Sequence, residues 1–408
     1  MAYTPNERIL KNYANVLVNF ALGGGKGIKK GEVVHITGSE SAKPLFIAVR
    51  NAVLDAGGHA IAQYAPDSTD PKDSLARYFF QNAKDHQLDW FPKKYAKGLV
   101  DEIDHVVHLI SESNKNELQG IDPKKIMRRG IAWKQARDWQ TDKELKGKFT
   151  WTIALSGTPA MAKEAGLSEK EYWAEIIKAC FLDKRDPIQE WKNVYKDIEK
   201  YRSRLNKLSP QIDKLHVKGV DADLWITLGA KRQWLAGSGR NIPSFEIFTS
   251  PDWRGTNGWI RFNQPLYRYG AKITGIQLWW KNGLVMNATA KTNEKLLKEM
   301  IATKDANKIG EYSLTDSRHS RITKFMAETL FDENMGGPQG NTHVAVGMSY
   351  KDTFKGNVAK LTKKQAEKLG FNDSSVHTDI ISTTKRTVTA HLKDGSTKII
   401  YDNGQFVL

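Results

Sequence analysis

The chain has 408 residues, of which 40% are hydrophobic and 26% charged, and its formal net charge is +16. This is an ordinary globular composition, and the length allows two domains with separate cores. No stretch reaches the roughly 18 consecutive apolar residues of a membrane span, and the single cysteine, Cys180, excludes an internal disulfide framework and a thiolate metal cluster.

The positive charge is compatible with two kinds of surface. Lys and Arg outnumber Asp and Glu by 62 to 46, and nucleic-acid binding depends largely on such residues contacting phosphates. The basic residues are, however, spread through the chain rather than massed in one block. A generally lysine-rich surface explains that distribution better, so we do not expect a nucleic-acid partner.

The N-terminal segment predicts an amphipathic helix. Apolar side chains recur at helical spacing from Ile9 to Phe20. The basic and then apolar layout of a secretion signal is missing. We therefore expect a cytoplasmic protein without a membrane partner.

The first part of the chain alternates strand-like and helix-like segments. The strand-like runs are "GEVVHITG" at 31–38, "HAIAQYAP" at 59–66, "HVVHLIS" at 105–111 and "TWTIALS" at 150–156. Strands separated by helix-length segments predict a parallel sheet covered on both faces. His105 and His108 are three residues apart on one strand and so point to opposite faces, which favours packing or ordinary hydrogen bonding over a shared ligand role.

Two helices are expected between residues 168 and 208. "SEKE" is a capping box from Ser168 to Glu171, and a second helix begins near Pro187. Near residue 236 the pattern changes at "LAGSGRNIP", a Gly, Ser and Pro junction.

Beyond this junction the sequence indicates antiparallel strands with one interrupting helix near "NEKLLKEMIATKDA". Dipeptides typical of hairpin turns lie between alternating runs at 257–258, 282–283, 394–395 and 403–404. The predicted fold is α/β plus α+β. An N-terminal parallel-sheet α/β domain spans 1–235, and a mainly antiparallel C-terminal catalytic domain spans 236–408.

Metal-competent side chains occur in several strand-like segments of the second region. Glu246 lies between apolar neighbours, Glu311 follows a glycine, and His343 enters a strand. His377 and Asp379 are two apart, so on a strand they point to the same face. Charged residues are seldom buried unless they are paired or bind metal. Each alone could be an exposed edge residue, but their number predicts a metal site.

Five phrases together resemble an ordered signature of the thermophilic aminopeptidase family, dinuclear metallopeptidases that include aminopeptidases T and S. They are "NIPSFEIFTSP", "IGEYSLTD", "TLFDEN", "NTHVAVGMSY" and "SVHTDII". "VVHITGS…AVLDAGG" and "WTIALSGTPAMA" are also similar to this family, so the resemblance covers nearly the whole chain.

The resemblance implies a ligand set and one further active-site residue. The implied metal ligands are Glu246, Glu311, Glu333, His343, His377 and Asp379. Tyr350, seven residues after His343, corresponds to the active-site tyrosine, although a strand-end aromatic packed on the sheet would look the same. Two features depart from the family pattern: the segment between Glu333 and His343 is longer, and Phe245 precedes Glu246 where a small or acidic residue is common.

Four carboxylates and two neutral imidazoles would balance two divalent cations, with Zn²⁺, Co²⁺ and Mn²⁺ all compatible with these donors. No "HExxH" motif is present. Paired metals roughly 3.5–4 Å apart can activate a water molecule and polarise a carbonyl.

The resemblance therefore implies a homodimeric, metal-dependent aminopeptidase that acts on peptides with a free N-terminus. Two alternatives stay open: another dinuclear amidohydrolase, or a non-catalytic basic protein that binds peptides or nucleic acid.

Overall fold

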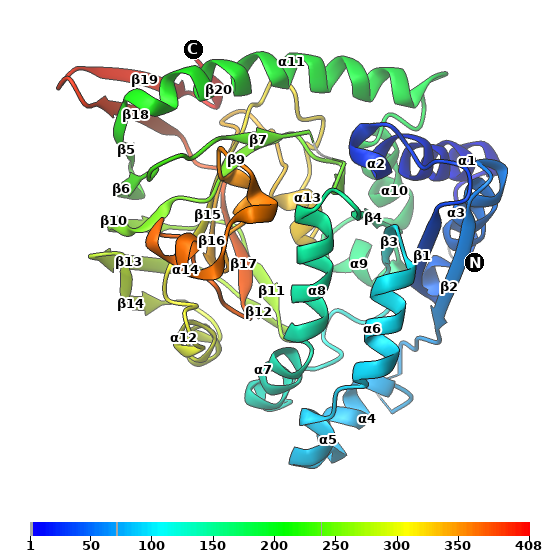
Figure 1. Cartoon of the computed structure of the whole chain (residues 1–408). Coiled ribbons are helices and arrows are strands. Elements are labelled where there is room, and N and C mark those ends of the chain that lie inside the picture. Colours follow the sequence, from blue (N-terminus) through cyan, green and yellow to red (C-terminus); the bar gives the residue numbers. More distant parts are fainter. Residues whose placement is uncertain (1–2, 71, 238) are drawn as a thin grey trace.

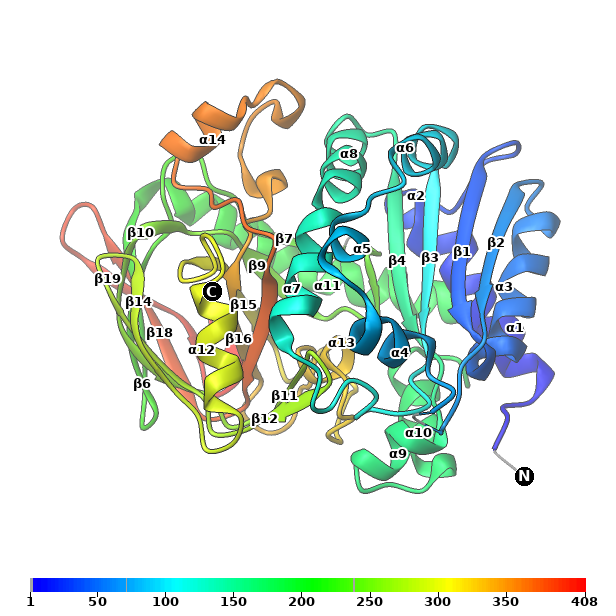
Figure 2. The ribbon, with the colours of Figure 1, turned by 90° about the horizontal axis from the view of Figure 1, so that it is seen from below.

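The computed structural model describes residues 3–70, 72–237 and 239–408. Two halves lie side by side, one built on a parallel sheet and the other on antiparallel sheets (Figures 1 and 2). The predicted fold class is confirmed.

The parallel sheet has the strand order β2-β1-β3-β4-β8. Its strands are β1 Val33–Ser39, β2 His59–Ala65, β3 His105–Ile110, β4 Thr150–Leu155 and β8 Asn241–Ile242. The first four are the strands that the sequence predicts. The short fifth strand comes from beyond residue 236 and pairs with β4, so it ties the later part of the chain to this sheet.

Most of the helices that precede residue 209 pack around the parallel sheet, whereas the last of them lies mainly over the antiparallel half (Figure 1). They are α1 Glu7–Val16, α2 Leu22–Gly25, α3 Lys43–Asp55, α4 Leu75–Asn82, α5 Asp85–Asp89, α6 Lys93–Glu102, α7 Pro123–Ala132, α8 Lys134–Leu145, α9 Pro159–Glu164, α10 Glu169–Ala179 and α11 Pro187–Leu208. The predicted N-terminal helix is confirmed as α1, which continues as a π-helix over Leu17–Ala21. The predicted capping box starts α10. The Ser168 side chain accepts a hydrogen bond from the backbone N–H of Glu171, and the Glu171 side chain accepts one from the backbone N–H of Ser168.

The antiparallel half contains an eight-stranded sheet of order β14-β13-β10-β6-β5-β18-β19-β20. Its strands are β5 Ile212–Gly219, β6 Ala222–Thr227, β10 Asp252–Arg261, β13 Gln277–Lys281, β14 Leu284–Thr289, β18 Arg386–Leu392, β19 Thr397–Asp402 and β20 Gln405–Phe406. Antiparallel pairing thus begins at β5, ahead of the junction near residue 236. The division into 1–235 and 236–408 stays a prediction about folding units.

A five-stranded sheet of order β17-β16-β15-β9-β7 lies between the eight-stranded sheet and the parallel half. Its strands are β7 Leu235–Ala236, β9 Glu246–Thr249, β15 Ile309–Thr315, β16 Asn341–Gly347 and β17 His377–Ser382. The remaining elements are the hairpin β11 Leu266–Arg268 and β12 Ala271–Ile273, and the helices α12 Glu294–Ala302, α13 Thr329–Asp332 and α14 Lys363–Lys368.

Three of the four predicted hairpin turns are confirmed, and one is wrong. The dipeptides at 282–283, 394–395 and 403–404 lie between consecutive paired strands. Asn257 and Gly258 instead lie inside β10, which pairs with β6 and β13. Gly258 has a φ of +104°, and a Cβ there would lie 2.0 Å from the backbone oxygen of Asp223. The close approach of β6, rather than a turn, requires this glycine.

The two faces of the five-stranded sheet differ in polarity. Ile247, Tyr312, Leu314, Val344 and Ile380 are buried in one hydrophobic cluster with residues of the eight-stranded sheet. Because side chains alternate along a strand, the residues between them point to the opposite face, toward the parallel half. The candidate metal ligands of the strands lie on that second face.

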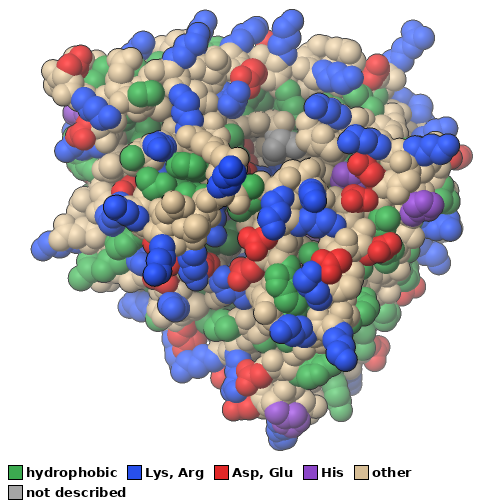
Figure 3. Space-filling view, viewed as in Figure 1, with side chains coloured by type: hydrophobic (Ala, Val, Ile, Leu, Met, Phe, Trp, Pro, Cys, Tyr) green, Lys and Arg blue, Asp and Glu red, His purple; other side chains and the backbone are tan. Residues whose placement is uncertain are grey.

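Among the described residues, no helix combines the length and apolar character needed to cross a membrane. On the face of the molecule drawn in Figure 3, Lys and Arg side chains are scattered rather than gathered into one patch.

Candidate metal centre

The register of four neighbouring strands brings five of the predicted ligands onto one face. Glu311 on β15 is opposite Ala345 on β16, which is opposite Asp379 on β17. His343 is opposite Ser313, and His377 is opposite Gly347. Glu246 on β9 is opposite Thr315. Residues opposite each other share a face of the sheet, so the pairing itself gathers these side chains.

His343 lies between two carboxylates. Its Nε2 is 3.2 Å from Oε1 of Glu311 and 3.3 Å from Oε2 of Glu246. Oδ1 of Asp379 is 3.9 Å from the same nitrogen. The carboxylate of Glu246 is also held by a hydroxyl group, because Ser313 Oγ donates to its Oε2 at 2.6 Å.

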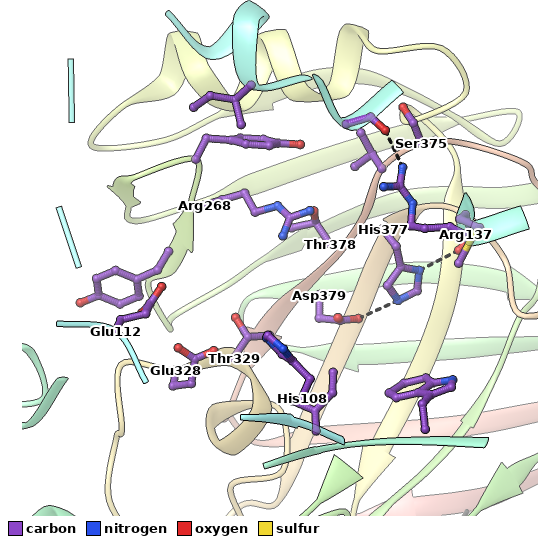
Figure 4. A pocket seen from close by; sticks show the side chains of 18 of the residues that line it. His108, Glu112, Arg137, Arg268, Glu328, Thr329, Ser375, His377, Thr378 and Asp379 are labelled. Atoms are coloured by element: carbon purple, nitrogen blue, oxygen red, sulfur yellow. Dashed lines mark hydrogen bonds and ion pairs between the residues drawn. The ribbon is translucent and has the colours of Figure 1, made fainter. Parts of the chain in front are cut away.

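The second histidine is oriented by the backbone. His377 Nδ1 donates to the carbonyl oxygen of Met348 at 2.8 Å. Its Nε2 is then 3.5 Å from Oδ1 of Asp379 (Figure 4). The same nitrogen is 3.7 Å from Oε2 of Glu311. A hydrogen bond from one ring nitrogen to a backbone carbonyl, with the other nitrogen facing carboxylates, is typical of metal-binding histidines.

Glu333 reaches the cluster from a different element. It caps the C-terminal end of α13 and is buried. Asn241 Nδ2, from β8 of the parallel sheet, donates to its Oε1 at 3.0 Å. Ligand atoms of Glu333, His343 and Asp379 lie within 4.8 Å of one another. The longer segment before His343 therefore does not keep Glu333 away from the other five residues.

Burial and mutual repulsion shape the protonation of the cluster. Burial raises the pKa of Glu246 to about 7, and the charges of Glu311 and Asp379 act in the same direction. Burial and the same kind of repulsion raise the pKa of Glu333 well above its ordinary value. Carboxylates that are buried together at such short range call for positive charge, which divalent cations can supply.

The neighbouring carboxylates favour the protonated form of both histidines. Burial alone would lower the pKa of His343 and of His377, but the neighbouring carboxylates raise both to about 9. Burial would likewise raise the pKa of Asp379, but His377 and His343 lower it to about 2. The oxygen and imidazole donors fit divalent cations such as Zn²⁺, Co²⁺ or Mn²⁺. Three overlapping groups of ligand atoms could hold them.

Tyr350 lies beside the cluster. Its ring centroid is 4.8 Å from that of His377 and 5.7 Å from that of Phe248, both in edge-on contact. Burial raises the pKa of Tyr350 well above 10, and Glu311 and Asp379 raise it further. The hydroxyl therefore stays protonated and can act as a hydrogen-bond donor, while the ring packs on the sheet.

A cavity of about 1210 Å³ between the two halves leads to this cluster. Its lining includes Tyr350, His377 and Asp379 on one side, and Ser39 and Ser111 at the carboxyl ends of β1 and β3 on the other. In open parallel sheets this edge is where ligands bind.

The predicted residues leave out several that the structure places at the site. Asn241, the carbonyl of Met348, and two arginines of the cavity wall, Arg137 and Arg268, gave no signal in the sequence. A backbone carbonyl is never visible in a pattern of side chains. Asn241 lies in the same phrase as Glu246, and Arg137 precedes Asp138, but nothing in these local patterns marks either residue or Arg268 as part of the site, so only their spatial position does.

Comparisons with known proteins match the chain to metalloproteases and aminopeptidases. A family profile described as thermophilic metalloprotease (M29) matches residues 6–406. Aminopeptidase PepS of Streptococcus thermophilus is 26% identical, with 98% of each chain covered. Aminopeptidase T of Thermus thermophilus is 28% identical over 73% of this chain and 76% of its own. The solved structure titled wild-type AmpT from Thermus thermophilus shares the fold, with a TM-score of 0.80 at 22% identity over 98% of this chain and 100% of that one.

Proposed function

The chain belongs to the thermophilic metalloprotease (M29) family, and we propose that its six clustered carboxylates and histidines hold two divalent cations. It is a metal-dependent aminopeptidase, and its substrates are peptides. The resemblance seen in the sequence is thereby confirmed.

The position of Glu311 carries the proposal of two cations. Its Oε1 is nearest His343 and its Oε2 is nearest His377, so each oxygen faces a different histidine. Glu311 also belongs to two of the three ligand groups, one with Glu246 and His343 and the other with His377 and Asp379. A carboxylate in this position can bridge two ions. Four carboxylates and two neutral imidazoles then balance two divalent charges, whichever of Zn²⁺, Co²⁺ or Mn²⁺ is bound.

Paired divalent cations, when bound, lower the pKa of water and polarise a carbonyl group. The chain's own contribution is to position the peptide and stabilise the developing charge. Tyr350 keeps its proton and lies beside His377, so its hydroxyl can donate to the carbonyl oxygen as negative charge develops there. Asn241 and the carbonyl of Met348 hold Glu333 and His377 in place.

The shape of the site supports cleavage at a chain end. The six candidate ligands themselves line a recess of about 50 Å³, together with Trp151, Asn241 and Ser244. Such a space holds a few water molecules and no further peptide residue. A peptide in the large cavity cannot extend through this recess. We propose that its free N-terminus lies at the cluster.

A pair of peptides that differ only in an N-terminal acetyl group tests the proposal. We expect the free-amine peptide to lose residues one at a time from its N-terminus, while the acetylated peptide stays intact, as followed by mass spectrometry. Exhaustive chelation should abolish the cleavage, and Zn²⁺, Co²⁺ or Mn²⁺ should restore it. Comparable cleavage of the acetylated peptide, or internal cuts in either peptide, would contradict the aminopeptidase reading while leaving the metal centre in place.

We also propose that two copies of the chain associate. Large apolar side chains are exposed on the protrusion formed by α4 to α7 (Figure 1), and they are Leu75, Tyr78, Trp90, Tyr95 and Ile131. Light scattering of the native protein and of Trp90→Lys tests this association, since a charged side chain on an apolar contact should shift the mass toward that of a monomer.

The one cysteine of the chain is buried and suits a reducing compartment such as the cytoplasm.

A further inference from the structure

Two arginines reach the wall of the large cavity from opposite halves of the molecule. Arg268 is the last residue of β11, in the antiparallel half, and Arg137 lies on α8, in the other half. Both line the cavity together with His377 and Asp379. Figure 4 shows the two guanidinium groups on the side of the cavity where β17 carries these candidate ligands.

Neither arginine is neutralised by a carboxylate contact. Within the described parts of the chain no carboxylate oxygen lies within ion-pair distance of Arg268, and its Nε is buried without a hydrogen-bond partner. Arg137 Nη2 donates to the neutral carbonyl of Gly130 at 2.8 Å. Burial lowers the pKa of Arg137, and the nearby charge of Arg268 lowers it further against the opposing effect of Asp138. The two cations thus repel each other across a partly buried space.

Two lysines on the same wall are paired with carboxylates. Lys115 is 3.0 Å from a carboxylate oxygen of Glu328, and Lys134 is 3.0 Å from one of Asp373. A partly buried charge without an ionic partner is costly, so an anion bound between Arg137 and Arg268 would be stabilised by both. The planar guanidinium group fits a carboxylate through two parallel hydrogen bonds.

The hairpin that carries Arg268 is held rigidly against the other half. Its two-residue turn ends at Gly270, with a φ of +71°, and a Cβ there would lie 2.4 Å from Cβ of Leu118. Tyr267 Oη donates to Oε1 of Glu164 at 2.6 Å. The guanidinium group of Arg268 therefore projects from a fixed backbone, which reduces the entropy lost when a ligand binds.

We propose that Arg268 and Arg137 form a carboxylate-binding subsite beside the metal centre, which selects peptides that carry a carboxylate close to the cleaved bond. This inference rests on the proposed function. Arg268 and Arg137 line the same cavity as His377 and Asp379 (Figure 4), so a carboxylate bound to them lies in the space that a peptide at the cluster occupies. Two groups of a peptide supply this chemistry: the C-terminal carboxylate of a short peptide and an acidic side chain.

Matched peptides separate the two sources. The first pair is Leu-Ala-Ala as the free acid and as the C-terminal amide, and the second pair is Leu-Glu-Ala-amide and Leu-Gln-Ala-amide. A charged, bidentate hydrogen bond predicts a kcat/KM about 10- to 100-fold higher for the carboxylate member of at least one pair. The pair that shows the preference identifies the source.

Three variants test which residues cause the preference. Arg268→Gln should bring the carboxylate-to-amide ratio close to one, and Arg137→Gln should lower it several-fold. Arg50→Gln is the matched control, since it removes one positive charge from an exposed position of α3 outside the cavity. It should keep the native ratio. If the native protein shows no preference in either pair, or if both cavity variants keep it, the inference is wrong.

Binding measured without turnover keeps this test separate from that of the proposed function. Isothermal titration calorimetry of the metal-loaded protein with acetylated Leu-Ala-Ala, as acid and as amide, should show the same preference in Kd, and Arg268→Gln should remove it. Preferential binding of the acid without any peptide cleavage would overturn the proposed function and keep the subsite. Equal kcat/KM values for the acid and amide peptides, together with equal Kd values, would overturn the subsite and keep the proposed function.

Discussion

The two five-stranded sheets both carry histidines in their strands, but the surroundings of these histidines differ. In the parallel sheet, His105 on β3 has one partner for each ring nitrogen: Nε2 is 2.9 Å from Oε2 of Glu32, and Nδ1 is 2.7 Å from Oγ1 of Thr150. In the antiparallel sheet, Nε2 of His343 alone faces two carboxylates at 3.2 and 3.3 Å.

This contrast shows what separates a structural histidine from a candidate ligand. Both kinds lie in short β-branched runs that look alike in the sequence. His105 is satisfied by an ordinary hydrogen-bond pair, as predicted from its position. The antiparallel pairing of β15, β16 and β17 instead places acids and histidines from several strands next to one another. The convergence of several carboxylates, rather than the histidine itself, marks the site.

The largest effect is expected from Glu311→Gln. This change removes the charge of the carboxylate whose two oxygens face His343 and His377. We expect bound metal to fall below two ions per chain and kcat/KM to fall by more than about 100-fold, beyond the loss typical of residues that only support ligands. Metal analysis and peptide kinetics measure both. The same substitution at Glu32, the residue before β1 of the parallel sheet, is the matched control, and Glu32→Gln should leave metal content and activity as in the native protein.

Tyr350→Phe should lower kcat by about 10²- to 10³-fold, the usual cost of losing one donor to a developing oxyanion. The ring contacts with Phe248 and His377 persist in phenylalanine, so folding and metal content should not change. Single-turnover kinetics with circular dichroism checks this prediction. A native kcat would reduce Tyr350 to a packing residue on the sheet.

Glu333→Gln should have a smaller effect, about 10- to 100-fold on metal affinity and activity together. Glu333 is the one candidate ligand that does not come from a strand of the five-stranded sheet, and Asn241 holds its Oε1. Metal titration followed by activity measurements gives both quantities. Native values for the two would remove Glu333 from the metal centre.

The smallest expected effect is a change in the free energy of unfolding when Glu32, beside the parallel sheet, is substituted. Burial would raise the pKa of Glu32, but the hydrogen bond from His105 lowers it below its ordinary value. Glu32 therefore stabilises the fold above its unfolded pKa of about 4.3, and this contribution is lost as the pH falls through its lower folded pKa. Glu32→Gln should reduce the free energy of unfolding by about 0.5–1.5 kcal/mol at pH 7.

Urea denaturation of the native and variant proteins at several pH values measures this difference. The difference in unfolding free energy should narrow below about pH 4. There Glu32 takes up a proton, first in the unfolded and then in the folded state, and becomes neutral like the glutamine of the variant. A difference that is independent of pH would assign the stabilisation to packing rather than to the charge.

Local patterns in the sequence were enough to identify most elements of the fold. The strands β1 to β4 lie where alternating β-branched runs predict them, and α10 begins at its capping box. These signals act over a few neighbouring residues, so they survive without knowledge of the rest of the chain. The family resemblance named the six candidate ligands and Tyr350 by residue type and order, which also needs no tertiary contact.

Tertiary structure decided everything that depends on segments distant in the sequence. Asn257 and Gly258 have the local chemistry of a hairpin turn, yet the neighbouring strand β6 makes them part of β10. Asn241 bonds to Glu333 across 92 residues of sequence, and Arg137 and Arg268 line one cavity only because the two halves pack around it. The sequence by itself therefore determined which elements form and which residues carry metal-binding groups. Strand register and packing between the halves decided which of those groups meet, because contacts through space leave no periodicity along the chain.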